Sequence, residues 1–259
     1  MRFTCGTFYI FSPVSMFSFL EKLRHPNHKH LNTLAYGVSE PNDYNTRAKS
    51  RTLTPGQHRA IATGTVLFHD GDDPMKQLLP MKAKSIPAHR DMLRNWWEIE
   101  TPADAVARLD SLHQVGHRSY RQPELVQNEH EWRQLFDRSD FLRGRPVQSV
   151  AGWDFARITN LAYWTYQIGL IDFDTACHYF DVSTRLTLGR FNSWDELATS
   201  FLAGRMMWNP DMMESHQIMV GIAKYLLQSP HNVWQECPWE GLCRLVDVSP
   251  LAVPPPVPY

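Results

Sequence analysis

Asp154 and Arg157 are the two residues of this chain whose types and spacing point most directly to chemistry. They stand three positions apart in an otherwise almost wholly apolar stretch, residues 150–168. On a helix, side chains at i and i+3 can reach each other, and a buried charge is costly unless it is paired. Other polar residues are embedded in aromatic or apolar surroundings in a similar way. The full candidate set is Asp154, Arg157, Arg205, His117, Arg118 and His178.

This candidate set supports two interpretations. In the first, which we favour, Asp154 and Arg157 form a structural ion pair that braces Arg205 or the backbone of a loop. In the second, the residues line a cleft in which Arg157 and Arg205 hold a carboxylate or a phosphate. Asp154 would then orient Arg157 or act as a general base, with a neighbouring histidine as the acid. Accessible, converging guanidinium groups favour the second interpretation, and sealed ones favour the first.

Two groups of histidines have spacings that could suit a metal ion. The three histidines between residues 25 and 30 have no cysteine or acidic ligand beside them, so we interpret them as a solvated cluster. His113 and His117 are four positions apart, but Gly116 is expected to end a helix between them. The sequence also lacks the motifs of P-loop NTPases, dinucleotide-binding enzymes, zinc proteases and serine hydrolases. We therefore predict no metal and no cofactor.

The candidate residues must be positioned by helices, because no strand pattern of useful length follows residue 54. Residues 150–168 predict a helix that is apolar on nearly all sides and therefore buried. Start signals place further helices around it. These signals are Thr54-Pro55, Thr101-Pro102, Pro123, Asp172, Ser193 with Glu196, and Asp211 with Glu214. We predict an all-α fold, a single globular domain of about seven to nine helices around the buried central helix 150–168.

Composition and the chain ends define the predicted organisation. Residues 1–52 are interpreted as a leader and polar arm, partly disordered, residues 53–248 as the helical domain, and residues 249–259 as a proline-rich tail. Residues 3–20 carry no charge, but serines, a glycine and a proline interrupt them, so we expect no membrane role. Four tryptophans are expected to anchor the core: Trp153, Trp164, Trp194 and Trp239.

Net charge and cysteine usage exclude further classes of protein. The formal net charge of −1 produces no overall field that would attract nucleic acid or an anionic membrane. The four cysteines are scattered and form no CxxC pair, which fits a reducing compartment better than a disulfide framework or a zinc ribbon. We expect a cytoplasmic protein without a nucleic-acid partner.

Three segments with a specific order and spacing resemble a known family. They are W-E-I-E-T-P-A-D through G-H-R at residues 97–118, G-W-D-F-A-R-I-T-N-L-A-Y-W at 152–164 and F-N-S-W-D-E-L-A-T-S-F-L-A-G-R at 191–205, and Pro238-Trp239 also fits. Over residues 53–245 the chain resembles a bacterial family of unknown function typified by the YbeU and YbeR proteins. The resemblance implies a mostly helical single domain in a bacterial, cytoplasmic protein. It transfers no catalytic residue.

The missing catalytic motifs and the many aromatic residues favour a non-catalytic role. We predict a protein-interaction protein of an accessory or immunity type, whose partner is another protein encoded nearby. An exposed aromatic patch would mark the partner surface. The alternative is an enzyme or anion-binding protein that uses the Asp/Arg cluster on a phosphate- or carboxylate-bearing substrate.

Overall fold

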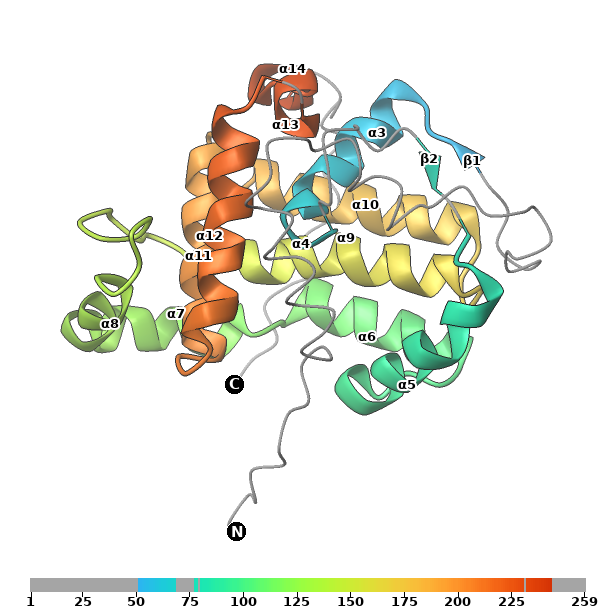
Figure 1. The fold of residues 1–259 in the computed structure, drawn as a ribbon, viewed down its shortest axis with the longest axis horizontal. Helices are drawn as coiled ribbons and strands as arrows, with labels where there is room; N and C mark the ends of the chain where they lie inside the picture. The colour runs from blue at the N-terminus through green and yellow to red at the C-terminus, as the bar shows by residue number, and fades with distance from the viewer. Residues whose placement is uncertain (1–50, 69–76, 79, 231, 244–259) are drawn as a thin grey trace, which may run out of the picture. The chain divides into compact units, whose positions relative to one another are not determined.

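The computed structural model describes residues 51–68, 77–78, 80–230 and 232–243, and it is all-α apart from one short pair of strands (Figure 1). Strands β1 (Arg51–Thr52) and β2 (Gln77–Leu78) pair antiparallel, with Arg51 opposite Leu78. The helices before the centre are α3 (Pro55–Ile61), η3 (Ala62–Gly64), α4 (Thr65–Phe68), η4 (Ala83–Ser85), α5 (Ile86–Trp97), α6 (Pro102–Gln114), α7 (Arg118–Gln127) and α8 (Glu129–Phe136). Those that follow are α9 (Gly152–Gln167), α10 (Phe173–Leu188), α11 (Trp194–Trp208), α12 (Met213–Gln228), α13 (Val233–Glu236) and α14 (Trp239–Cys243).

The all-α prediction is confirmed. Within the described residues, nine α-helices are seven residues or longer, which agrees with the predicted number. None of the helices in these ranges combines the length and the apolar character needed to cross a bilayer. The predicted leader up to residue 50, its three histidines and the proline-rich tail lie outside the described residues.

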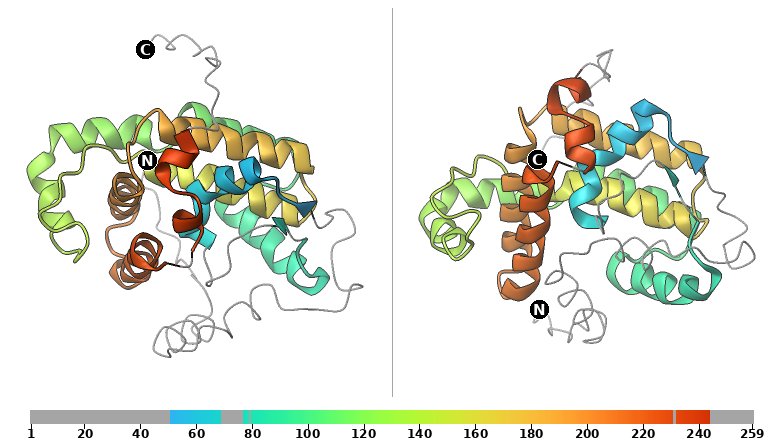
Figure 2. Two further views of the ribbon diagram at one scale, coloured as in Figure 1. Left: turned by 90° about the horizontal axis from the view of Figure 1, so that it is seen from above. Right: turned by 45° about the horizontal axis from the view of Figure 1, so that its top comes forward.

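Helix α9 is the central element, as predicted. Fourteen of its sixteen residues are buried, because neighbours cover it on several sides. Figure 1 shows α10 and α6 running alongside it, and Figure 2 shows α11 running across it. The helix ends where Gly169 adopts a left-handed conformation at φ 76°, which a residue without a Cβ adopts without strain.

Small residues allow α9 and α11 to approach closely where they cross. The backbone N–H of Gly152 donates to Ser200 Oγ at 2.9 Å. A Cβ atom at Gly152 would lie 2.8 Å from the backbone nitrogen of Phe201, and one at Gly204 would lie 2.6 Å from the carbonyl oxygen of Val150. Real Cβ atoms do not approach backbone atoms that closely, so both positions require glycine in this packing.

Most predicted helix starts are confirmed by their caps. Side chains of Thr54, Thr101, Asp172 and Ser193 each accept a hydrogen bond from a first-turn N–H group. The predicted cap at Asp211 is wrong, because Met212 occupies the N-cap of α12 without a side-chain hydrogen bond. Asp211 therefore lies one position outside the helix, where it does not take the capping role.

The start predicted at Pro123 is also wrong. Helix α7 begins five residues earlier, at Arg118, and Pro123 lies inside it. No side chain at His117, the N-cap, accepts a hydrogen bond from the first turn. The partner of that turn comes instead from α9, which no local signal in residues 113–123 could indicate.

The four tryptophans predicted as anchors occupy different environments. Trp194 stacks on Trp234 with ring centroids 4.8 Å apart and meets Trp239 edge-on at 5.0 Å. These contacts join α11 to α13 and α14. Trp153 is buried, whereas Trp164 is only partly buried and meets the ring of His89 edge-on.

Candidate functional site

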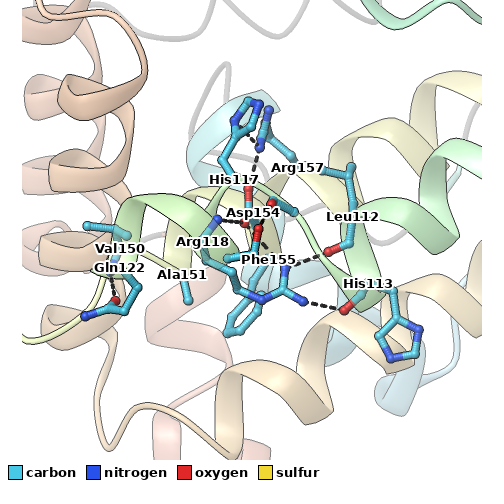
Figure 3. A network of polar contacts seen from close by, with 12 residues as sticks. Leu112, His113, His117, Arg118, Gln122, Val150, Ala151, Asp154, Phe155 and Arg157 are labelled. Atoms are coloured by element: carbon cyan, nitrogen blue, oxygen red, sulfur yellow. Dashed lines mark hydrogen bonds and ion pairs between the residues drawn. The ribbon is translucent and has the colours of Figure 1, made fainter. Parts of the chain in front are cut away.

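Asp154 is the centre of a polar network at the start of α9 (Figure 3). It is fully buried, and both carboxylate oxygens accept hydrogen bonds. Oδ1 accepts from Nη2 of Arg157, the residue one turn along the same helix. Oδ2 accepts from the backbone N–H of Arg118 at 2.7 Å, and the Arg118 guanidinium lies 3.4 Å away. The pairing of Asp154 with Arg157 that the sequence predicts is present in the structure.

Arg118 connects the corner between α6 and α7 to the central helix. Its Nη1 donates to the carbonyl of Leu112 at 2.6 Å, and its Nη2 donates to the carbonyl of His113. Both carbonyls belong to the last turn of α6, where a cation is favoured by the helix dipole and by unsatisfied carbonyl groups. Asp154 in turn caps the first turn of α7 through the Arg118 N–H. One carboxylate and one guanidinium thus terminate two helices.

Gly116 permits this close approach. It has a φ of +61°, and a Cβ atom there would lie 2.3 Å from Asp154 Oδ2. The same atom would lie 2.5 Å from Nη1 of Arg118. The glycine that was expected only to end α6 therefore also makes room for the carboxylate.

Arg157 is buried between two indole rings. Its Cζ atom lies 4.8 Å from the ring centroid of Trp153 and 5.6 Å from that of Trp97, both within the range of a cation–π interaction. Burial lowers the pKa of Arg157, and Asp154 opposes that shift. A single nitrogen, Nη2, makes both of its hydrogen bonds within the described residues, while Nε is buried without a partner.

His117 accepts a hydrogen bond from Arg157 and is therefore neutral. Its Nδ1 lies 2.9 Å from Arg157 Nη2. Because a guanidinium has only donors, Nδ1 must be the acceptor and Nε2 must carry the proton. Burial, assisted by the positive charge of Arg157, lowers the pKa of His117 to about 4. Tyr120 packs edge-on against the imidazole ring at 5.5 Å.

The remaining candidates lie elsewhere. Arg205 donates to Ser215 Oγ on α12, and no hydrogen bond or ion pair among the described residues links it to Arg157 or Asp154. His178 packs edge-on against Tyr179 on α10. Burial, assisted by the positive charge of Arg118, lowers the pKa of the nearby His113. The structure thus brings together Asp154, Arg157, His117 and Arg118, and it separates Arg205 and His178 from them.

Three aromatic residues near the network were not among the sequence candidates. Trp97 covers Arg157, and Trp208 packs against Trp153 with ring centroids 5.5 Å apart. Burial raises the pKa of Tyr120, and the positive charges of Arg121 and Arg157 oppose that shift. Tyr120 is 46% exposed and Trp208 is 38% exposed. We call Trp97, Tyr120, Trp153 and Trp208 the aromatic cluster. Its residues come from four helices, so no pattern within one helix could reveal it.

Outside the Asp154 network, the described residues offer few groups that could form a catalytic or metal-binding site. They contain no group of three histidine, cysteine, aspartate or glutamate side chains that could hold a metal ion. Burial raises the pKa of the Cys177 thiol to about 11, so it is not a ready nucleophile at neutral pH. A cleft of about 420 Å³ is lined by residues that include Arg145, Arg190 and Asp195, and by none of the candidate residues.

The comparisons with known proteins agree with the helical region described above. A family model described as a protein of unknown function, DUF1266, matches residues 92–239. No curated protein and no solved structure matches the chain. The matched region contains the whole Asp154 network and helices α6 to α13. Because this match spans more than half of its length, the chain belongs to the DUF1266 family of proteins of unknown function.

Proposed function

We propose that this protein is a non-catalytic binding protein that recognises a protein partner through the aromatic cluster. The observation that carries the proposal is the contrast between Asp154 and its surroundings. Asp154, the candidate base, is sealed and accepts from two arginines, whereas Tyr120 and Trp208 nearby are substantially exposed. A side chain enclosed in this way serves the fold, while exposed aromatic rings beside it are available to a partner.

Acid–base catalysis is less well supported at this site. A general acid works best when its pKa lies near the working pH, and the pKa of His117 is lowered to about 4. His117 is therefore neutral at pH 7 and holds its Nδ1 lone pair toward Arg157. Asp154 carries its charge against two guanidinium groups and is not exposed to a substrate. These features favour binding over proton transfer.

The positive charge beside the aromatic cluster favours a partner that presents an acidic side chain beside apolar ones. Arg118 and Arg157 carry two positive charges against the single negative charge of Asp154, and His117 adds none. Aromatic and arginine side chains are the residues that most often dominate binding energy at interfaces. An accessory or immunity-type role in a bacterial cytoplasm, and a closer kinship with the YbeU and YbeR proteins, remain predictions from the sequence.

The proposal is tested by isolating a partner and then measuring its affinity. The full chain is used to capture proteins from an extract of its native host, and the captured protein is purified and titrated by calorimetry. Tyr120→Ala and Trp208→Ala should each weaken binding by about thirtyfold, or about 2 kcal/mol, as expected for interface hot spots. Val126→Ala is the matched control, because Val126 is 73% exposed on the same helix as Tyr120. A partner that binds all three variants as tightly as the parent would show that the surface is elsewhere.

A further inference from the structure

Arg205 is a buried cation that has no anionic partner among the residues described by the structure. Its side chain extends from α11, and only 6% of the residue is exposed. Its single hydrogen bond within the described part of the chain goes from Nη2 to Ser215 Oγ, a neutral acceptor, at 2.5 Å. A guanidinium has five N–H donors, and a buried charge of this kind is strongly destabilising unless an opposite charge compensates it. Burial accordingly lowers the pKa of Arg205 to about 10.

The contact to Ser215 places the guanidinium at the start of α12. Ser215 is the third residue of that helix, and no side chain caps the helix at Met212. The N–H groups of Met213, Glu214 and Ser215 find no hydrogen-bond partner among the described residues. The first turn of a sixteen-residue helix carries partial positive charge. A cation beside it is unfavourable, whereas an anion that contacts both the Arg205 guanidinium and this turn would be stabilised by both.

The other groups around Arg205 in the described part of the chain supply no negative charge. His216 is buried, and its Nε2 lies 2.9 Å from Ser139 Oγ. Its Nδ1 is also buried and has no hydrogen-bond partner within the described ranges. Burial, assisted by the positive charge of Arg205, lowers the pKa of His216 to about 4. The nearest acidic residues along α12 and its preceding turn, Asp211 and Glu214, are exposed and form no ion pair with Arg205.

We propose that Arg205, Ser215 and the first turn of α12 form a binding site for an oxyanion group, a phosphate or a carboxylate. The guanidinium of Arg205 presents the paired donors that suit such oxygens. The Ser215 hydroxyl and the free N–H groups of the first turn provide further donors beside the guanidinium. The site is distinct from the Asp154 network and stands independently of the partner surface proposed above.

The first test uses the full chain without any variant. Inorganic phosphate and sodium acetate are titrated separately at constant ionic strength, with chloride as the balancing anion. Binding is followed by the melting temperature and by the ¹⁵N shifts of the His216 ring, while the exposed His130 serves as an internal control. We expect a saturable rise in melting temperature and a saturable shift confined to His216. The anion that binds more tightly identifies the site as one for phosphoryl or for carboxylate groups. No saturable response to either anion overturns the proposal.

The second test uses variants of the site. Arg205→Met keeps the apolar length of the side chain and should weaken anion binding by at least about tenfold. Ser215→Ala should weaken it less, and it serves as the second variant if Arg205→Met does not fold. Arg90→Met, which removes one exposed charge from α5, should bind as the parent does. Binding that is equal in the parent, Arg205→Met and Ser215→Ala would show that the anion binds elsewhere and would refute the assignment.

Discussion

The backbone N–H of Arg118 donates to the Asp154 carboxylate at 2.7 Å, across 36 positions of sequence. Through this contact a side chain of the central helix caps another helix. The guanidinium of Arg118 in turn caps the C-terminal end of α6 by donating hydrogen bonds to the carbonyls of Leu112 and His113. The charged cluster that is most suggestive of catalysis is therefore also the joint that holds the α6–α7 corner against α9.

The first prediction concerns Asp154 and Arg157. Asp154→Asn should lower the free energy of unfolding by about 3–5 kcal/mol, because it leaves the buried guanidinium of Arg157 and the partly buried guanidinium of Arg118 without their counter-charge. Arg157→Met should cost less, about 1–2 kcal/mol, because Asp154 keeps its contacts to Arg118. The double variant should lose less free energy of unfolding than the sum of the losses in the two single variants. Urea unfolding monitored by tryptophan fluorescence measures all three. If Asp154→Asn unfolds at the same urea concentration as the parent, the network does not stabilise the fold.

The second prediction concerns Gly116. Gly116→Ala should lower the free energy of unfolding by about 2–4 kcal/mol, because it combines a left-handed backbone with a Cβ that collides with Asp154. Gly144→Ala is the matched control, since Gly144 has a φ of +69° and nothing within 4 Å of a Cβ. The control should show the conformational cost alone, about 1 kcal/mol. Equal losses in the two variants, measured by chemical unfolding, would mean that crowding at Asp154 is unimportant.

The third prediction concerns the crossing of α9 and α11. Gly204→Ala should destabilise the protein by about 2–3 kcal/mol, because the added methyl group would overlap the Val150 carbonyl and Trp153. Gly221→Ala places the same change inside α12, where nothing lies within 4 Å of a Cβ. That variant should be more stable than the parent by about 0.5–1 kcal/mol, from helix propensity. Thermal melting of the pair gives the comparison, and a Gly204→Ala protein that melts like Gly221→Ala would contradict the close packing.

The fourth prediction concerns pH and His216. The pKa of this residue is lowered from 6.5 to about 4 in the fold, so between these values the unfolded chain binds a proton that the folded chain excludes. The contribution of neutral His216 to the free energy of unfolding is fully present above pH 6.5 and is lost as the pH falls toward 4. His216→Gln should remove part of this pH dependence, and the part due to His117, whose pKa is also lowered to about 4, should remain. His130→Gln, an exposed control, should leave the profile unchanged. The measurement is the urea midpoint at several pH values in phosphate-free buffer. An unchanged profile in His216→Gln would show that another group is responsible.

The features that the sequence determines by itself are local ones. The all-round apolar character of residues 150–168 predicts a buried central helix, and Thr101 and Asp172 predict helix starts that the structure confirms. The pairing of Asp154 with Arg157 is equally local, since one helical turn brings the two side chains together. Each of these depends on residues only a few positions apart.

The tertiary structure decides which of the embedded charges meet. It places Arg118 against Asp154, makes Gly116 a contact residue, and leaves Arg205 with Ser215 instead of with Arg157. It also begins α7 at Arg118, because a carboxylate from α9 can cap a helix as well as a local side chain does. Helical periodicity states which face of a helix is buried but not which helix covers it. The partners of a buried charge follow from the packing of several helices, and only the folded chain shows them.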